Sequence, residues 1–309
     1  MAKDRIESKY VTVAPGVELH ILEKGEGKPL VFIPGLTFSG EIFKHQLEYF
    51  SSKYRVIAID PRGQGYSAKT VDGNDYLTHG RDVAGLIDAL GLEDIVLIGW
   101  STGNLDTWSY VQQFSKDKLH GIVTIDMSPL PLSPDPKWWT EGTIEGLSQV
   151  ATQVLTSSQG CREFFSEYAT GVMIQHEMKP DELEYLLDIS GRTPYWICRQ
   201  LFCDAVFSNY LDTAKDVGAT MPSLMFIAEH WQDVAKPFVE TQLPGYDTYV
   251  LYVNELSLAG KVPYETKDDT AKAITGKKAA EGGILPNDNV RIYVPMDLNA
   301  DILRDRVDI

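Results

Sequence analysis

Short runs of apolar residues recur along most of the chain and predict the strands of a sheet. Val17, Leu19 and Ile21 alternate with polar neighbours, which is typical of a strand with one buried face. Later runs are continuously apolar, as in parallel strands that helices cover on both faces. These runs lie at 30–33, 56–59, 95–98, 122–125 and 224–227, and a last strand is expected at 249–253.

Helical periodicity separates these runs. Val83, Leu86, Ile87 and Leu90 recur at helical spacing, and the pattern ends at Gly91. A second helix is expected at 105–114, directly after the run at 95–98. Because strands and helices alternate, we expect right-handed crossovers and an α/β fold with a doubly wound, mostly parallel sheet.

Between 133 and 218 the strand pattern is absent, and helical stretches begin at Pro180 and Pro194. This block predicts a helical cap inserted into the sheet. The chain therefore divides into a first core part, a cap, the last core strands and a divergent C-terminal tail, expected at 1–132, 133–218, 219–253 and 254–309.

Composition narrows the function classes. The chain has 309 residues, 43% of them hydrophobic, and a formal net charge of −16, which would repel nucleic acids and anionic membrane surfaces. The three cysteines lack metal-ligand spacing and indicate reduced thiols. The charged N-terminus lacks an apolar run, so we expect a cytoplasmic protein. With nucleic acids and membranes disfavoured, we expect a small-molecule substrate. Whether the protein forms a homodimer stays open.

One serine lies in a sequence motif that is typical of a nucleophilic serine. Gly99-Trp100-Ser101-Thr102-Gly103 follows the strand at 95–98 and opens a helix. In that context the glycines allow a tight strand-to-helix turn, which exposes the serine at the carboxyl edge of the sheet. We therefore predict Ser101 as a nucleophile.

An earlier strand end offers hydrogen-bond donors for the same site. Pro34-Gly35-Leu36 follows the run at 30–33, and the glycine lets the backbone turn there. The backbone N–H groups of Leu36 and Thr102 are the predicted oxyanion hole.

Five sequence blocks in order resemble the α/β-hydrolase superfamily. They are PLVFIPG, YRVIAIDPRGQGYS, VLIGWSTGN, GIVTIDMSP and MPSLMFIAEH, and the resemblance covers about residues 10–251. It implies an eight-stranded sheet, a helical cap between strands six and seven, and chemistry without a cofactor, usually ester or other acyl hydrolysis. The block DPRGQGYS is expected to shape a turn beside the site.

The family's catalytic acid follows strand six or strand seven. Asp126 directly follows the run at 122–125 and is the first candidate, as in the layout of some alcohol acetyltransferases and cofactor-free dioxygenases of this superfamily. Glu229, after the run at 224–227, is the second candidate. A purely structural Asp126 is the alternative.

The catalytic base poses a difficulty, because the family places a histidine after strand eight. The last of the six histidines is His230, and residues 252–309 contain none. His230 follows strand seven at the same sheet edge as Ser101, two strand spacings or roughly 10 Å away. We predict it as a substitute base, and we interpret the other histidines as surface or core residues.

The tail differs in composition from the rest of the chain. Residues 252–309 contain three tyrosines but no Trp, Phe, His or Cys. One hypothesis is that a frameshift, fusion or recombination supplied this segment. Sequencing the coding DNA across residues 249–255 tests it, and an uninterrupted native frame would contradict it.

These features favour a cofactor-free serine hydrolase for a small, largely apolar ester or related acyl substrate, impaired if the base is absent. The predicted substrate pocket contains Trp100, Trp138, Trp139 and Trp196, although core packing explains these tryptophans equally well. One alternative is a non-catalytic ligand-binding protein or the inactive product of a rearranged gene. Another is cofactor-free dioxygenase or haloperoxidase-like activity.

Overall fold

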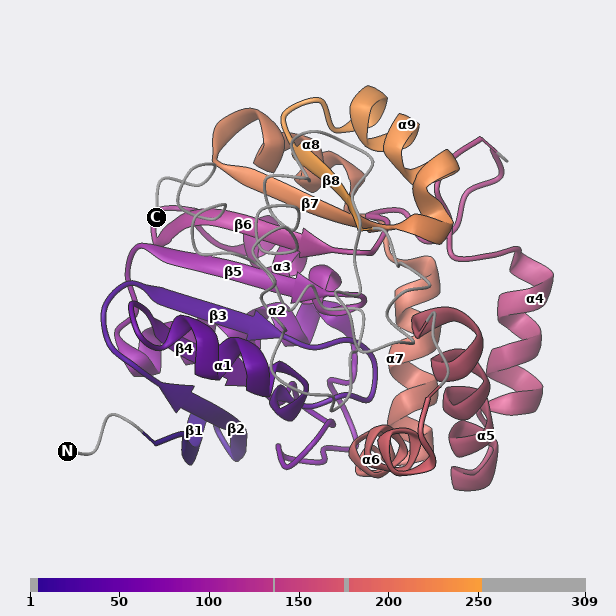
Figure 1. Cartoon of the computed structure of the whole chain (residues 1–309), viewed down its shortest axis with the longest axis horizontal. Coiled ribbons are helices and arrows are strands. Elements are labelled where there is room, and N and C mark those ends of the chain that lie inside the picture. Colours follow the sequence, from indigo (N-terminus) through magenta and orange to yellow (C-terminus); the bar gives the residue numbers. More distant parts are fainter. Residues whose placement is uncertain (1–4, 136, 175–177, 252–309) are drawn as a thin grey trace.

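A computed structural model describes residues 5–135, 137–174 and 178–251, and the predicted tail lies outside them. Eight strands form one sheet in this part of the chain, in the order β1-β2-β4-β3-β5-β6-β7-β8 (Figure 1). The strands are β1 (Glu7–Ala14), β2 (Val17–Lys24), β3 (Pro29–Ile33), β4 (Arg55–Ile59), β5 (Ile95–Trp100), β6 (Leu119–Ile125), β7 (Ser223–Ala228) and β8 (Asp247–Leu251).

The sheet is mostly parallel, as predicted. β2 pairs antiparallel with β1 and with β4, whereas every pair from β4 to β8 is parallel. The carboxyl ends of the parallel strands therefore meet at one edge of the sheet. This edge carries the motif residues that follow β3, β5, β6 and β7.

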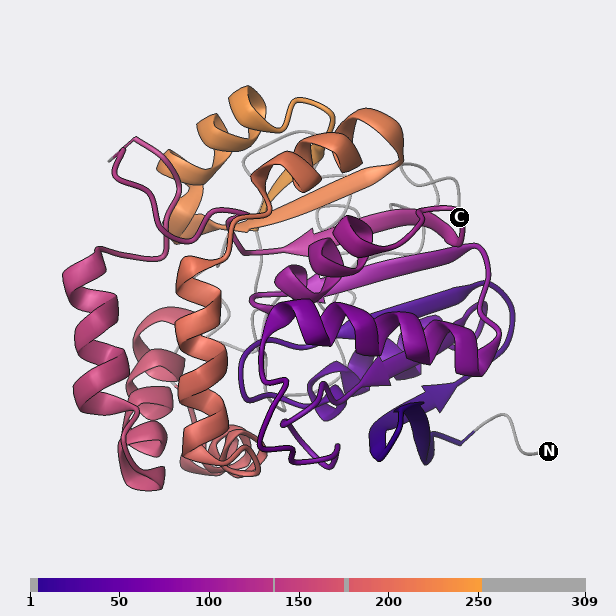
Figure 2. The same cartoon turned by 180° about the vertical axis from the view of Figure 1, so that it is seen from behind.

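Helices cover both faces of the sheet, with α1 on one face and α2, α3 and α8 on the other (Figures 1 and 2). The helices of the core are η1 (Gly40–Phe43), α1 (Lys44–Phe50), α2 (Tyr76–Leu90), α3 (Gly103–Gln113), α8 (Leu211–Thr220), η4 (Glu229–Trp231) and α9 (Gln232–Gln242). Between β6 and β7 the chain also forms α4 (Ile144–Gln149), η2 (Val150–Val154), α5 (Ser158–Tyr168), η3 (Ala169–Met173), α6 (Pro180–Gly191) and α7 (Tyr195–Phe207).

The central strands are buried on both faces, which explains their continuous apolar runs. In β3, Val31 and Ile33 belong to the core cluster under α2 and α3, whereas Leu30 and Phe32 belong to the cluster under α1. All four side chains are fully buried. Burial on alternate faces removes the polar positions that a half-exposed strand would show.

The inserted helices α4–α7 lie beside the carboxyl edge of the sheet (Figure 1). α6 begins at Pro180, as the sequence predicts, because proline is well suited to the first turn of a helix. α2 ends at Leu90 and is capped by Gly91, whose φ of 58° is a left-handed conformation that glycine adopts freely. The division of the chain at 133 and 218 stays a prediction.

One strand was missing from the sequence prediction. β1 pairs with β2 over most of its length, but only Val11 of this strand is buried. Its mixture of exposed and partly buried residues gives no clear period of two, because the strand lies at the sheet edge.

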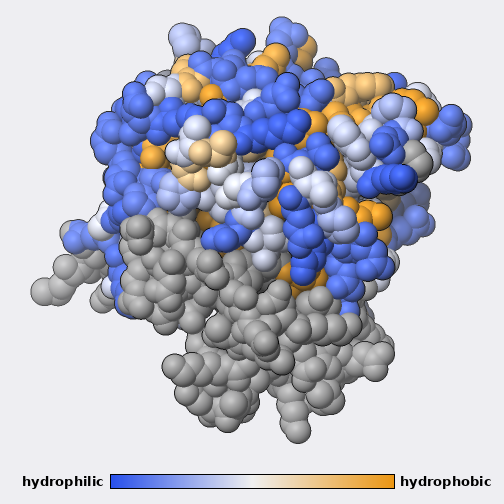
Figure 3. All heavy atoms as spheres, turned by 90° about the horizontal axis from the view of Figure 1, so that it is seen from above, coloured by the Kyte–Doolittle hydropathy of each residue, from blue (hydrophilic) through white to orange (hydrophobic). Residues whose placement is uncertain are grey.

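The described surface fits the acidic composition. Hydrophilic residues dominate the described part of the face above α8 and α9, and hydrophobic residues occur there in small groups (Figure 3). In the described part of the chain, no helix combines the length and apolar character that a membrane span requires.

Candidate active site

Ser101 occupies the sharp turn between β5 and α3. Its φ of 51° lies in the left-handed region, which is unusual for a residue with a side chain. A Cβ atom on Gly99 would lie 2.5 Å from the Asn104 Oδ1 atom, and one on Gly103 would lie 2.3 Å from the Ile33 carbonyl oxygen. The two glycines of the motif are therefore required by close packing around the turn.

Hydrogen bonds hold this turn against the end of β6. The Ser101 N–H donates to the Ile125 carbonyl oxygen at 2.8 Å. The Asn104 side-chain amide donates to the same oxygen at 2.9 Å and to the Ser101 carbonyl oxygen at 3.0 Å. These bonds fix the backbone on both sides of the serine.

The predicted oxyanion loop lies against the serine. A Cβ atom on Gly35 would lie 2.9 Å from the Ser101 Cβ atom, so only glycine permits this approach. The N–H groups of Leu36 and Thr102 have no hydrogen-bond acceptor within the described residues. Two free amides beside a nucleophile are suited to hold a developing oxyanion.

Gln64, from the DPRGQGYS block, braces this loop. Its side-chain oxygen accepts from the Thr37 N–H at 2.7 Å, and its amide donates to the Phe38 carbonyl oxygen at 3.0 Å. Thr37 itself has a φ of 68°, and its hydroxyl lies 2.7 Å from the Ser190 hydroxyl of α6. The block therefore shapes the site through a buried amide, and the loop is also tied to the inserted helices.

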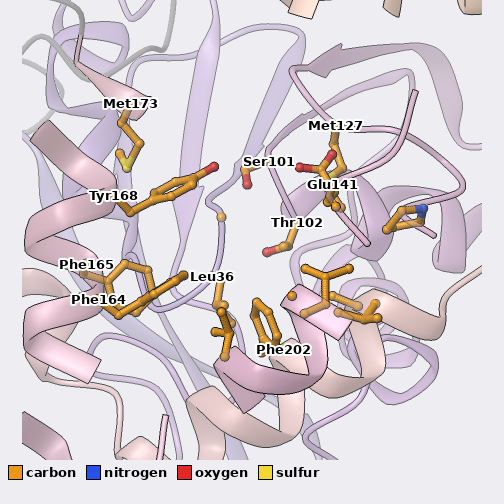
Figure 4. A pocket seen from close by; sticks show the side chains of 18 of the residues that line it. Leu36, Ser101, Thr102, Met127, Glu141, Phe164, Phe165, Tyr168, Met173 and Phe202 are labelled. Atoms are coloured by element: carbon orange, nitrogen blue, oxygen red, sulfur yellow. The ribbon is translucent and has the colours of Figure 1, made fainter. Parts of the chain in front are cut away.

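Ser101 lines a cavity of about 380 Å³ (Figure 4). Its size is in the range of small-molecule sites. The sheet edge contributes Leu36, Trp100, Ser101 and Thr102, and the inserted helices contribute mainly apolar side chains. The larger ones from the helices are Leu147, Phe164, Phe165, Tyr168, Met173 and Phe202.

Asp126 lies at the end of β6, where the sequence places the catalytic acid. Its Oδ1 atom accepts a hydrogen bond from the Ala228 N–H at 2.9 Å, which joins it to the end of β7. Burial raises the pKa of Asp126 to about 7, although the bond from Ala228 opposes the shift. No imidazole of the described residues contributes to this shift.

Glu141 is a site residue that sequence reasoning missed. It lies in the loop between β6 and α4, and Figure 4 shows its carboxyl group pointing into the cavity toward Ser101. Burial, and next the charge of Asp126, raise the pKa of Glu141 to about 7, while a hydrogen bond from the Ser128 N–H lowers it. Its loop shows no periodicity and no motif, so no sequence signal could have found it.

The structure does not bring His230 to the cavity. His230 lies on η4 after β7, is partly buried, and is absent from the residues that line the cavity. Burial lowers its pKa. Glu229, the second candidate for the acid, lies beside it on η4 and also does not line the cavity.

Three other histidines pair with carboxylates away from the cavity. His20 Nδ1 lies 2.9 Å from Asp60, His79 Nδ1 lies 2.8 Å from Asp106, and His120 Nδ1 lies 2.8 Å from Asp94. His45 belongs to α1, and His176 lies outside the described residues. Within the described residues, no histidine lines the cavity.

Of the four tryptophans predicted for the pocket, only Trp100 lines it. Trp138 and Trp139 instead pack against Phe238 of α9, at ring-centroid distances of 5.8 and 6.5 Å. Trp196 packs against the core cluster under α2 and α3. The other aromatic lining residues are Phe38 after β3, Phe164, Phe165 and Tyr168 of α5, and Phe202 of α7.

Comparison with known proteins agrees with this geometry. A family model described as the alpha/beta hydrolase fold matches residues 28–187, which include the oxyanion loop, the Ser101 turn and Asp126. The chain belongs to this family. The alpha/beta hydrolase sheet and its strand order explain why the motif residues share one edge.

Among curated relatives, the chain is similar to a non-heme haloperoxidase of Rhodococcus erythropolis, with 34% identity over 139 residues. The match covers 45% of this chain and 49% of that protein, so the chain spans about half the length of the curated relative. This alpha/beta hydrolase therefore has haloperoxidase relatives whose similarity is confined to part of the chain.

Solved structures share the fold over a longer range. The bromoperoxidase of Bacillus anthracis has a TM-score of 0.71 at 19% identity, covering 79% of this chain and 91% of that one. An esterase of Exiguobacterium antarcticum has the same TM-score at 18% identity, covering 79% of this chain and 90% of its own. At these identities the likeness concerns the fold alone.

Proposed function

We propose that this alpha/beta hydrolase is a cofactor-free serine hydrolase for small, largely apolar esters or related acyl compounds. One observation carries the proposal: Ser101, on a turn that close packing fixes, opens into a mainly apolar cavity beside two free backbone amides. An esterase occurs among the solved structures with this fold, so the fold is compatible with ester hydrolysis.

In the proposed reaction the Ser101 Oγ atom attacks the acyl carbon of the substrate. The N–H groups of Leu36 and Thr102 then hold the negative charge that develops on the carbonyl oxygen. Loss of the alcohol leaves an acyl-serine, which water hydrolyses. The sequence predicts that His230, oriented by Asp126, transfers the proton. The structure places His230 outside the cavity lining, and its role stays a prediction.

Hydrolysis of short p-nitrophenyl esters by the wild-type protein and by Ser101→Ala tests the proposal. We expect turnover by the wild type and its loss in the variant, because the variant lacks the attacking oxygen. Turnover that Ser101→Ala leaves unchanged would contradict the proposal. A folded wild type without turnover would favour a ligand-binding protein.

Haloperoxidase-like perhydrolysis is the second candidate, favoured by the match to the Rhodococcus erythropolis protein. In this reaction hydrogen peroxide replaces water in attacking an acyl-Ser101, which gives a peracid and the free serine. The peracid would then oxidise a halide ion. Bromination that requires a short carboxylic acid and peroxide, and that Ser101→Ala abolishes, would support this activity; bromination that persists in Ser101→Ala would exclude this route.

A further inference from the structure

The cavity contains a carboxyl group with no partner for one of its oxygens. The Oε1 atom of Glu141 is buried and has no hydrogen-bond partner within the described residues. A buried acceptor without a partner costs free energy of folding. Such an acceptor beside a nucleophile therefore indicates a role in binding or catalysis.

The loop that carries Glu141 is held in place by its own hydrogen bonds. The Glu141 N–H donates to the Pro131 carbonyl oxygen at 2.8 Å. The Ser128 hydroxyl donates to the Trp139 carbonyl oxygen at 2.7 Å. The loop that carries Glu141 is therefore anchored to residues 128–131, which follow Asp126 after the end of β6.

The cavity is enclosed on its other side by Tyr168 of α5. Figure 4 shows the Tyr168 hydroxyl and the Glu141 carboxyl pointing toward Ser101 from opposite sides. Burial, and then the charges of Glu141 and Asp126, raise the pKa of Tyr168, so this hydroxyl stays neutral. Within the described residues, Glu141 is the only carboxyl that lines the cavity.

We propose that Glu141 is the general base that takes the Ser101 proton, with Asp126 as the residue that tunes it. This inference rests on the proposed serine hydrolase function and names the base of that reaction. No direct hydrogen bond joins the Ser101 hydroxyl to Glu141 in the described residues, and the cavity has room for one bridging water.

In the hydrolysis of an ester, Glu141 accepts and returns one proton in each half of the reaction. The Ser101 Oγ atom bonds to the acyl carbon, the carbonyl π electrons move to its oxygen, and the serine proton passes through the water to the Glu141 carboxylate. The neutral Glu141 then returns that proton to the leaving alkoxide as the carbon–oxygen bond breaks. In the second half, Glu141 takes a proton from the attacking water, and the proton finally returns to Ser101.

The environment suits this role. An ordinary carboxylate is a weak base, whereas one whose pKa lies near 7 is about half ionised at neutral pH and accepts a proton more readily. The charge of Asp126 also raises the pKa of Glu141, so the ionisation of Asp126 affects how readily Glu141 accepts a proton. The pair supplies proton transfer without an imidazole.

The test compares Glu141→Gln with Glu145→Gln, a matched loss of one carboxylate on the exposed side of α4. Two readouts are used: the rate at which a fluorophosphonate modifies Ser101, followed by peptide mass spectrometry, and kcat and KM for a short p-nitrophenyl ester. We expect Glu141→Gln to lower the labelling rate and kcat by about 100-fold or more with little change in KM. Glu145→Gln should match the wild type.

The pH profile separates a base from a structural residue. In the wild type, kcat/KM should rise with pH through an apparent pKa near 7, because the base must be ionised. Glu141→Gln should lose this rise. If Glu141→Gln does not fold, Glu141→Asp keeps the carboxyl one methylene further back, and the same fall in kcat without a rise in KM is expected.

Three outcomes would overturn the inference: wild-type labelling and kcat in Glu141→Gln, a change in KM alone, or loss of labelling in His230→Gln but not in Glu141→Gln. The last outcome would leave the proposed function intact with an imidazole base. Absence of labelling in the wild type itself would instead contradict the proposed function.

Discussion

The two sides of the cavity are built differently. On the nucleophile side, Ser101 is fixed by glycine contacts and by hydrogen bonds from its own N–H and from Asn104. On the opposite side, Glu141 has a buried oxygen without a partner within the described residues. Asp126 lies behind it, outside the cavity lining, and accepts one hydrogen bond from the Ala228 N–H at the end of β7. The first side holds the Ser101 Oγ atom in a fixed position. The second side holds carboxyl groups that gain and lose protons during the proposed reaction.

The two sides also differ in how they respond to pH. Backbone amides that surround Ser101 carry no titratable charge, so they act equally at every pH. Burial holds the two carboxyls near a pKa of 7, where their charge responds to small changes in pH. The site thus has a rigid half around Ser101 and a titrating half that contains the two carboxyls.

The largest expected effect is on the nucleophile. Ser101→Ala should lower kcat for a short ester by about 10⁴-fold or more, because only binding and the oxyanion amides then remain. Steady-state kinetics measure the loss. Ser109→Ala, which alters a buried serine of α3 outside the cavity lining, is the matched control and should keep most of the activity.

The next effect concerns the rigid half. Gly103→Ala should destabilise the protein by about 2–4 kcal/mol, because its Cβ atom would lie 2.3 Å from the Ile33 carbonyl oxygen. Gly191→Ala is the control, since a Cβ atom there meets nothing within 4 Å and α6 should gain up to about 1 kcal/mol. Urea unfolding measures both, and equal stabilities would refute the packing argument.

The titrating half should make the free energy of unfolding depend on pH. The folded pKa of Glu141, about 7, lies above its ordinary 4.5, so its contribution is full below pH 4.5 and is lost as pH rises to about 7. In Glu141→Gln, the loss of stability between pH 5 and pH 8 should shrink by roughly 1–3 kcal/mol. Urea unfolding at both pH values checks this, and an unchanged difference would contradict the raised pKa.

The smallest effect is expected from the brace of the oxyanion loop. Gln64→Ala removes the acceptor of the Thr37 N–H and the donor to Phe38, so the Leu36 amide loses part of its support. We expect a fall in kcat of about tenfold and a loss of about 1–3 kcal/mol of stability. A variant with wild-type kcat would show that the loop holds its shape without Gln64.

What could be predicted from the sequence follows the same division. The Ser101 turn and the Gly35 loop were predictable, because close packing there requires glycine at fixed positions next to apolar strands. The position of Asp126 was predictable because this residue directly follows an apolar strand. Glu141 was not, since its burial depends on β6, β7 and the inserted helices meeting in space. Trp138 and Trp139 carry no local sign that they pack on α9 and not in the cavity.

The most direct test of the central claim is intact-protein and peptide mass spectrometry of the wild type after exposure to a fluorophosphonate. Such reagents modify a serine when a base and an oxyanion hole activate it. We expect one phosphonyl group per chain, located on Ser101 and absent from Ser101→Ala. A folded wild-type protein that stays unmodified would contradict it.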